Sequence, residues 1–329
     1  MKPAVTPYDP AADCIPPAPD ETLRIRSADG HWIHAEAFGP AGAPLVVLAH
    51  GWTCSIRFWA PVIRQLTPDY RVVAYDQRGH GGSDRPPTQA GYSTTKLADD
   101  LEAVLRRVVP EGGRAVLAGH SMGGMTIMAA ADRTAVADRT AAAVLVSTGA
   151  GDLLAELAVL PPFVRSAGAR RLVHKLLLES RMPLGKVNGV SSAALKYATM
   201  GPASSPARVR ATAEVVHACP TSTRHRWSQV LGGLDEYHQL PKLTAPTAVI
   251  VGSHDRLTPP VHARRIEALL PDSHGLLELP GVGHMSPVER PAEVAGEIRR
   301  LAGIGFAATR VTEKSSATKS ATTQGSVSQ

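Results

Sequence analysis

The sequence predicts an α/β fold built on a doubly wound, mostly parallel sheet. Short apolar runs that are typical of buried strands alternate with stretches whose apolar residues recur at helical spacing. Glycine-rich polar turns follow several of these runs, at the strand ends where parallel sheets carry their chemistry. The chain has 329 residues, 43% of them hydrophobic, which is long enough for one large domain with an insertion.

The chain opens with two segments of different character. Residues 1–21 contain six prolines, and we expect them to form a flexible arm without regular structure. Thr22–Ser27 and His31–Phe38 alternate apolar and polar residues around Asp29-Gly30, which predicts a β-hairpin. This hairpin would supply a leading antiparallel pair of strands.

The core domain, residues 22–149 and 244–303, continues with strands and helices in alternation. Its further predicted strands are 45–49, 70–75, 115–118, 142–147, 247–251 and 276–279. Its predicted helices are 55–66, 94–109, 261–270, 291–301 and one that ends near 131.

Two segments depart from this alternation. Residues 150–243, called the insertion below, have helical spacing interrupted by prolines and no convincing strand. We expect them to form a helical insertion after the sixth strand. Residues 304–329 are rich in Ser, Thr, Ala, Lys and Gln and cannot bury enough apolar surface to fold, so we expect a disordered tail.

The most informative motif of the chain is G-H-S-M-G at 119–123, which lies between an apolar run and a helix. Glycine is needed on both sides of Ser121, because the turn is too tight for side chains there. The turn would lift the Ser121 hydroxyl clear of the sheet and point the positive end of the helix at the reacting carbon. Ser121 is therefore a candidate nucleophile.

A serine nucleophile needs a base and a carboxylate that orients the base. Asp255 follows the strand that ends at 251, and His284 follows the last strand. Serine, acid and histidine then occur in the chain order expected after a strand–turn–helix elbow. Two alternatives stay open: Asp255 could cap the helix that follows it, and Asp152 could act as the acid.

Five motifs together resemble the α/β-hydrolase fold superfamily: H-G-W at 50–52, D-x-R-G-H-G-x-S-D at 76–84, G-H-S-M-G-G at 119–124, G-x-x-D at 252–255 and G-x-G-H at 281–284. The resemblance extends from about Leu23 to Ala302 and puts the insertion in the place of that family's cap. It suggests a serine hydrolase of an esterase, lipase or haloperoxidase-like branch. The motifs are specific for the fold and much less so for the substrate.

The resemblance also implies a role for each site residue. It implies Ser121 as nucleophile, His284 as general base and Asp255 as its orienting acid. It implies an oxyanion hole made by the backbone N–H groups of Trp52 and Met122. Removing one such donor typically costs about 2.7 to 4 kcal/mol of transition-state stabilisation.

Other polar residues of the motifs are expected to be structural. His50 and His120 would brace loops through hydrogen bonds, and Asp76 and Arg78 would hold the glycine-rich turn together. The three cysteines are far apart in the chain and predict neither a disulfide framework nor a zinc site. We expect no metal and no cofactor.

The insertion carries the positive charge of the chain. It holds 12 of the 35 Lys and Arg residues and 6 of the 29 Asp and Glu residues, and so accounts for the formal net charge of +6. Its basic residues either form a solvated face, or steer acidic substrates or associate weakly with an anionic membrane surface. They include Arg165, Arg170, Arg171, Lys175, Arg208, Arg210, Arg224 and Arg226.

The insertion is also rich in leucine and valine, which either pack on the sheet domain or form an apolar acyl pocket. The apolar residues are Leu153, Leu154, Leu157, Val159, Leu160, Phe163, Val164, Leu172, Val173, Leu176, Leu177 and Leu178. With Trp52, we take Leu153 and Leu157 as candidate substrate-binding residues.

Serine at 121 favours an acyl-enzyme route, because the family resemblance implies a carboxylate at this position in enzymes that open epoxides or displace halide. Our first hypothesis is a serine hydrolase that cleaves a carboxylic ester with an apolar acyl part. A second keeps the triad in a cofactor-free haloperoxidase or perhydrolase, or in a carbon–carbon bond hydrolase. A third is a non-catalytic binding protein on the same fold.

The remaining expectations concern location and partners. No run of about eighteen apolar residues predicts a membrane-spanning helix, and the first residues lack the pattern of a secretory signal. We expect a cytoplasmic protein whose partner is a small-molecule ester, with no nucleic-acid module. The sequence makes no prediction of oligomeric state.

Overall fold

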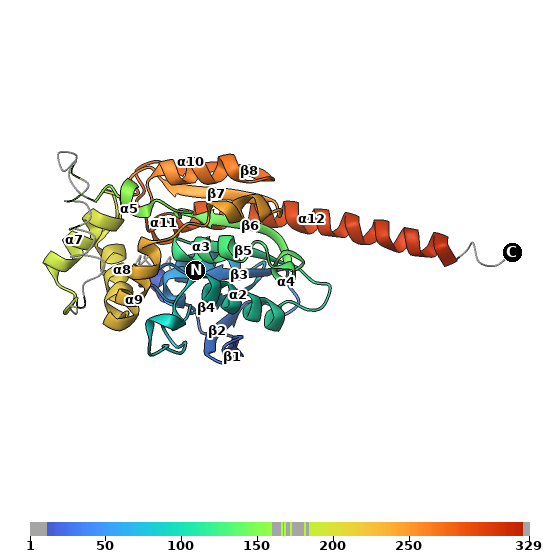
Figure 1. The fold of residues 1–329 in the computed structure, drawn as a ribbon, viewed down its shortest axis with the longest axis horizontal. Helices are drawn as coiled ribbons and strands as arrows, with labels where there is room; N and C mark the ends of the chain where they lie inside the picture. The colour runs from blue at the N-terminus through green and yellow to red at the C-terminus, as the bar shows by residue number, and fades with distance from the viewer. Residues whose placement is uncertain are drawn as a thin grey trace, which may run out of the picture.

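The computed structural model describes residues 12–324, except 160–165, 167, 169–171, 173–180, 182 and 183. In the described residues, eight strands form one sheet in the order β1-β2-β4-β3-β5-β6-β7-β8 (Figure 1). The strands are β1 (Glu21–Arg26), β2 (Trp32–Phe38), β3 (Leu45–Ala49), β4 (Arg71–Tyr75), β5 (Ala115–His120), β6 (Thr140–Val146), β7 (Thr247–Gly252) and β8 (Ser273–Leu279). The predicted α/β fold with a mostly parallel sheet is confirmed.

The pairing of the strands places their ends. β2 is antiparallel to both β1 and β4, and the other neighbours are parallel. Ala49 at the end of β3 pairs with Gly119 of β5, and Val146 at the end of β6 pairs with Ile250 of β7. Because parallel strands end at the same edge, the turns after β3, β5, β6 and β7 lie together there.

Helices cover both faces of the sheet. The first face carries α2 (Thr94–Val108), α3 (Met122–Ala129) and α10 (Pro260–Leu269), with the short α4 (Thr134–Ala137). The second carries η2 (Ile56–Trp59), α1 (Ala60–Leu66), α11 (Ser286–Glu289) and α12 (Pro291–Gln324). The sheet is therefore doubly wound, as predicted.

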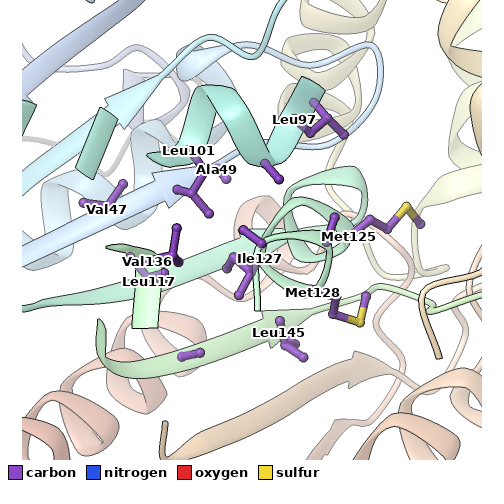
Figure 2. Close-up of a cluster of buried hydrophobic side chains, with 14 of the residues drawn as sticks. Val47, Ala49, Leu97, Leu101, Leu117, Met125, Ile127, Met128, Val136 and Leu145 are labelled. Carbon is purple, nitrogen blue, oxygen red and sulfur yellow. The ribbon is translucent and has the colours of Figure 1, made fainter. Parts of the chain in front are cut away.

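Buried side chains of the central strands alternate between two apolar clusters. In β3, Val47 and Ala49 belong to the first cluster, and Val46 and Leu48 belong to the second. Figure 2 shows part of the first cluster, where Leu101 of α2 and Ile127 of α3 lie among side chains of the sheet. A strand buried on both faces has a continuous apolar sequence, which is why the central strands could be predicted from the sequence.

The described residues between β6 and β7 contain helices and no named strand. These elements are α5 (Leu153–Glu156), α7 (Gly189–Thr199), α8 (Pro206–Ala218), α9 (Thr221–Gly232) and η4 (Tyr237–Lys242). A single isolated bridge pairs Gly151 with Asp235 and joins the two ends of the insertion. The insertion's boundaries at 150 and 243, and its role as a cap, stay predictions. None of the helices in the described part of the chain is long and apolar enough to cross a membrane.

The C-terminal segment differs from the prediction. We expected a disordered tail at 304–329, but α12 continues as a helix to Gln324 and projects from the body of the molecule (Figure 1). Its first part is anchored by the buried side chains of Val294, Ile298 and Leu301. Further residues extend a helix that has already formed, so the cost of starting one does not arise. Composition alone missed this continuity.

The described part of the N-terminal arm also differs from the expected flexible segment. Ala12–Cys14 forms a 3-10 turn, η1, and the Cys14 side chain is buried. The Arg64 guanidinium of α1 donates two hydrogen bonds to the Ile15 carbonyl, at 3.1 and 2.8 Å. Prolines prevent a helix or a sheet ladder there, but they do not prevent packing on the domain.

The two edges of the sheet carry charged side chains. β1 forms one edge, where the guanidinium carbons of Arg24 and Arg26 lie 4.9 and 5.9 Å from the ring centre of Trp32 in β2. β8 forms the other edge, and its Glu278 pairs with Arg264 of α10 at 2.9 Å.

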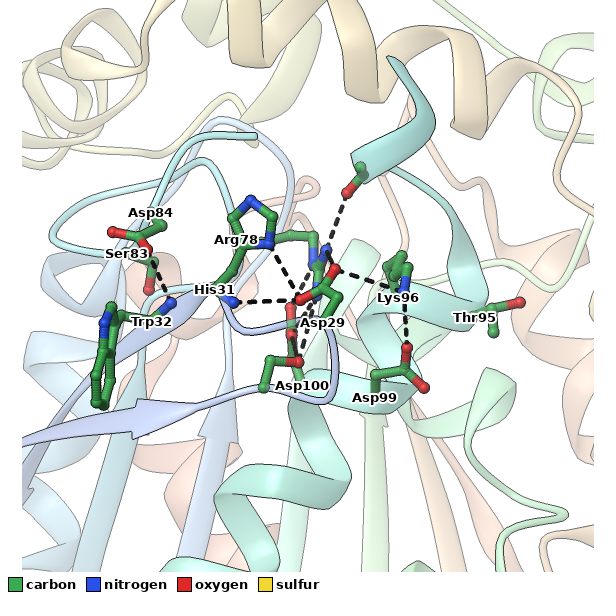
Figure 3. A network of polar contacts seen from close by, with 12 residues as sticks. Asp29, His31, Trp32, Arg78, Ser83, Asp84, Thr95, Lys96, Asp99 and Asp100 are labelled. Carbon is green, nitrogen blue, oxygen red and sulfur yellow. Dashed lines mark hydrogen bonds and ion pairs between the residues drawn. The ribbon is translucent and has the colours of Figure 1, made fainter. Parts of the chain in front are cut away.

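A buried ion-pair network fixes the hairpin and α2 to the glycine-rich turn (Figure 3). Arg78 binds Asp100 of α2 through two bonds, Nε to Oδ2 at 2.7 Å and Nη2 to Oδ1 at 2.6 Å. Its Nη1 donates to Asp29 of the hairpin turn at 2.9 Å. The Arg78 side chain is fully buried, so these bonds replace the water it has lost. The expected structural role of Arg78 is confirmed.

Replacing Asp100 with alanine should destabilise the fold strongly, because it leaves a buried guanidinium short of its main partner. We expect the Asp100→Ala variant to lose about 3 to 5 kcal/mol of unfolding free energy, measured by urea denaturation. The Glu214→Ala variant, which breaks the exposed Arg210–Glu214 pair, should change it by less than about 1 kcal/mol. Equal effects of the two substitutions would contradict this account.

Candidate active site

Ser121 occupies the strained turn that the sequence predicted. It follows β5 and precedes α3, with φ 51° and ψ −117°, a backbone conformation that L-residues rarely adopt. A Cβ atom added to Gly123 would lie 2.1 Å from the Ala49 carbonyl oxygen, and one added to Gly119 would lie 2.4 Å from that of Gly123. Only glycine fits at both positions, so the close packing of α3 on β3 and β5 produces the turn.

The candidate acid and base are in direct contact. His284 Nδ1 lies 2.9 Å from Asp255 Oδ2, and both side chains are buried. Asp255 Oδ1 accepts backbone N–H bonds from Leu257 and Thr258, both at 2.9 Å, and the Thr258 hydroxyl donates to Oδ2 at 3.0 Å. The carboxylate is thus fixed from several sides, and it holds the His284 proton on Nδ1, which leaves Nε2 as the basic nitrogen.

The alternatives for the acid are not favoured by this geometry. Asp255 does not cap α10, which begins later, at Pro260, with Pro259 at the capping position. Asp152 has a left-handed backbone with φ 56°, and its side chain is 62% exposed. Its nearest ionic partner is Arg265, at 3.8 Å, rather than a histidine.

His120, the residue before Ser121, connects His284 to the serine turn. The His120 Nε2 atom is 2.9 Å from the His284 carbonyl oxygen, and the two ring centres are 4.9 Å apart. Between Ser121 Oγ and the His284 ring, the described residues show no hydrogen bond. The structure therefore brings Asp255 and His284 together directly and places Ser121 one residue from a ring that contacts His284.

The predicted oxyanion donors flank Ser121. A Cβ added to Gly51 would lie 3.1 Å from Ser121 Cβ, so the loop that carries Trp52 runs next to the serine. Neither the Trp52 nor the Met122 backbone N–H donates to another backbone group within the described residues. The Trp52 indole N–H donates to the Arg224 carbonyl of α9 at 3.1 Å, which ties this loop to the insertion.

Buried neutral histidines support the loops around the site. His50 Nε2 accepts a hydrogen bond from the Gln77 backbone N–H at 3.0 Å, and its Nδ1 lies 2.7 Å from the Gly51 carbonyl oxygen. Burial lowers the pKa of His50 from 6.5 to about 4 and that of His80 to about 3. Burial also lowers the pKa of His120 well below its usual value. The expected bracing role of His50 is confirmed by its two backbone contacts.

Asp76 and Cys54 lie near the loop that follows β3. Asp76 accepts hydrogen bonds from the backbone N–H groups of Ile56 and Gly82, at 2.8 and 2.9 Å, and so holds the glycine-rich turn as expected. Cys54 is buried, and burial raises the pKa of its thiol far above the usual range. It therefore lacks the thiolate character of a nucleophile.

The candidate substrate residues lie at the same edge of the sheet. Trp52 and Leu153 are half-buried and pack against the apolar cluster that includes Met122. Leu157 follows α5 and is also half-buried. Leu172 is exposed. Leu154 and Val159 are half-buried as well. The remaining apolar candidates lie outside the described residues: Leu160, Phe163, Val164, Val173, Leu176, Leu177 and Leu178.

The basic residues of the insertion divide into two groups. Arg165, Arg170, Arg171 and Lys175 lie outside the described residues. Within them, the Arg208 side chain donates to the Glu289 carbonyl at 2.8 Å, and that of Arg226 donates to the carbonyls of Pro86 and Pro87. Arg224 is buried, and Arg210 pairs with Glu214. The described arginines thus make contacts within the protein, and a membrane contact stays a prediction.

Sequence reasoning missed several residues that support the site. The Thr148 hydroxyl donates to the Ser121 carbonyl at 2.8 Å, and Ser147 Oγ lies 3.0 Å from Ser286 Oγ, two residues after His284. Thr258 contacts both Asp255 and His284. Thr258 gives a weak signal in the sequence, because it lies three residues after Asp255 and before a helix. The other two contacts join segments that are distant in the chain, and no sequence pattern predicts them.

The buried histidines predict a pH dependence of stability. Between pH 6.5 and about 4 the unfolded chain protonates His50 while the folded chain keeps it neutral, so stability should fall as the pH falls. One such group contributes at most about 1.4 kcal/mol per pH unit. The His50→Gln variant should therefore show a shallower fall in unfolding free energy, measured by urea denaturation across this range. An unchanged slope would contradict the assignment.

Comparisons with known proteins find enzymes that are similar to this chain over part of its length. A bifunctional esterase/perhydrolase from Acinetobacter calcoaceticus is 38% identical over 101 residues, 30% of this chain and 35% of that protein. Epoxide hydrolase A of Mycobacterium tuberculosis is 38% identical over 119 residues, 35% of this chain and 36% of that enzyme. The chain thus spans about a third of the length of these curated relatives.

Similarity over most of the chain is found with a solved structure and with a family model. The structure of an esterase from a Rhodococcus species matches with a TM-score of 0.71, at 24% identity, over 86% of this chain and 98% of that one. Residues 44–291 match the family described as alpha/beta hydrolase fold. These residues include the serine turn, both buried partners and the insertion, and the chain belongs to the α/β-hydrolase fold family.

Proposed function

We propose that the protein is a serine hydrolase that cleaves a carboxylic ester with an apolar acyl part. The observation that carries this proposal is the buried contact between Asp255 and His284 at the sheet edge that also bears the strained Ser121 turn. A buried carboxylate that holds a histidine proton on Nδ1 is the arrangement that makes the other ring nitrogen a base. Its position next to a serine held at φ 51° favours nucleophilic catalysis.

The chemistry would proceed in two halves. In the first, Ser121 Oγ attacks the ester carbonyl while His284 Nε2 takes the hydroxyl proton, and the Trp52 and Met122 N–H groups stabilise the negative oxygen. The tetrahedral intermediate collapses, and His284 returns the proton to the leaving alcohol. In the second half, water attacks the acyl-enzyme with His284 as base, and the acid leaves with Ser121 restored.

Substrate contacts would come from both the core domain and the insertion. Trp52 lies in the loop after β3, Leu153 lies in α5, and both pack against the first apolar cluster; Leu157 follows α5 in the insertion. Their half-buried apolar surfaces fit an apolar acyl group. Serine at 121, rather than a carboxylate, favours ester cleavage over the epoxide opening named for one relative.

Replacing the proposed nucleophile and replacing the proposed acid should reduce the rate of ester hydrolysis to different extents. We expect the Ser121→Ala variant to lose turnover of p-nitrophenyl esters and labelling by a fluorophosphonate probe. The Asp255→Asn variant should keep labelling weakly and lose about 10⁴-fold in kcat, because the asparagine stabilises the wrong histidine tautomer. The exposed Asp272→Asn variant is the matched control and should keep wild-type kcat.

Two outcomes would overturn the proposal. Full ester turnover in the Ser121→Ala variant would show that another group acts. A wild-type protein that is folded but neither labels nor hydrolyses any ester of a chain-length series would favour a non-catalytic binding protein instead.

A second candidate function is perhydrolysis, in which hydrogen peroxide replaces water in attacking the acyl-enzyme and a peracid leaves. The name of the Acinetobacter relative, which joins esterase and perhydrolase, favours testing it. If it holds, the peracid should oxidise added bromide to hypobromite and itself become the acid, so bromination of monochlorodimedone should depend on peroxide, bromide and an acyl donor and should vanish with Ser121→Ala. Absence of halogenation in an active esterase would leave ester hydrolysis alone.

A further inference from the structure

Glu289, at the end of α11, is a buried carboxylate that the proposed chemistry does not use. Its side chain is nearly inaccessible, with 4% of the residue exposed. Its Oε1 atom accepts the Gly283 backbone N–H at 3.0 Å. Its Oε2 atom accepts the Gly201 backbone N–H at 2.7 Å and the Ser204 hydroxyl at 2.6 Å.

These three donors belong to two segments that are far apart in the sequence. Gly283 immediately precedes the candidate base His284. Gly201 and Ser204 lie between α7 and α8 of the insertion. One carboxylate therefore bridges the loop of the base and the insertion.

The same two segments are in direct backbone contact. The His284 and Met285 backbone N–H groups both donate to the Thr199 carbonyl, at 2.7 and 3.2 Å. A Cβ added to Gly201 would lie 2.0 Å from the Gly281 carbonyl oxygen, and one added to Gly283 would lie 2.5 Å from the Met200 carbonyl carbon. The two backbones fit without room for a side chain, so a shift of one segment must move the other.

A carboxylate in this position is costly for stability. Burial raises the pKa of Glu289, and its hydrogen bonds with Ser204, Gly201 and Gly283 oppose this effect only in part. Apolar packing would fill such a space at lower cost. A carboxylate, however, has two oxygens that both accept, whereas an amide side chain has one accepting oxygen and an apolar side chain has none.

We propose that Glu289 is a positioning residue that sets the place of His284 by fixing its loop to residues 199–204 of the insertion. The inference rests on the proposed hydrolase function, because it concerns the base of that reaction. The position of His284 relative to Ser121 then depends on the position of the insertion. Glu289 itself touches no reacting atom.

The test uses two substitutions at different distances from the reaction. Glu289→Gln keeps the size of the side chain but turns an N–H group toward one of the donors. We expect it to lower kcat for p-nitrophenyl esters by about 10- to 100-fold, the effect of a displacement of about 1 Å, with little change in KM. Ser204→Ala removes one donor from the insertion and should lower kcat in the same direction by a smaller factor.

A structural role alone would give a different pattern. It would lower the melting temperature but leave kcat per folded molecule unchanged at a temperature where circular dichroism shows both variants folded. We expect instead a lowered kcat there, with KM little changed, in both Glu289→Gln and Ser204→Ala. The Glu293→Gln variant, at an exposed glutamate four residues further along, is the matched control and should keep wild-type kinetics.

The outcomes separate this inference from the proposed function. If the wild-type protein hydrolyses esters and Ser121→Ala abolishes the activity, unchanged kcat in Ser204→Ala and in folded Glu289→Gln overturns the inference alone. If Glu289→Gln does not fold, Ser204→Ala decides, and a wild-type kcat there overturns it. If the wild-type protein hydrolyses no ester and takes up no fluorophosphonate, the proposed function fails first.

Discussion

Parallel pairing of the central strands is the constraint on which the site depends. β3, β5, β6, β7 and β8 end at one edge of the sheet, so segments that are up to 235 residues apart in the sequence, such as those at 49 and 284, meet there. The apolar clusters on both faces hold this pairing in place. The strain at Ser121 is a local result of the same packing, because α3 can approach β3 only through Gly123.

The insertion contacts the core domain at several places, which include α9 and residues 199–204 at this edge. α9 lies on the glycine-rich turn, where the Trp227 indole donates to the Arg78 carbonyl at 3.1 Å and the Thr223 hydroxyl donates to that of Gly79 at 2.8 Å. Residues 199–204 lie on the loop of His284. At both contacts, polar groups of the insertion form hydrogen bonds with polar groups of the core domain, which gives the two parts a defined relative position.

Much of this architecture could be predicted, because local sequence patterns determine it. The first two strands were predicted from alternating residues and the other six from apolar runs, and the serine turn was predicted from its glycines, which are needed where backbone approaches backbone. Asp255 and His284 were found from their places after strands. The contacts of Glu289 and Ser147 were not, since they join residues 85 and 139 positions apart, and no spacing in the chain marks such pairs.

The ends of the chain show the limits of composition. Six prolines in the first residues predicted flexibility, yet Cys14 is buried and Ile15 is held by Arg64. A polar tail predicted disorder, yet a helix anchored by Ile298 and Leu301 continues through it. In both cases a tertiary contact outside the segment decides its conformation, and such a contact cannot be read from the segment's own residues.

The stacking of Arg24 and Arg26 on Trp32 has a consequence for the behaviour of the protein at high concentration. An outermost strand offers unpaired N–H and C=O groups to any other strand that approaches, and β1 is such a strand. The two stacked guanidinium groups put positive charge on the outermost strands, so an identical edge that approached would meet like charge. Like charges oppose edge-to-edge pairing of two such sheets.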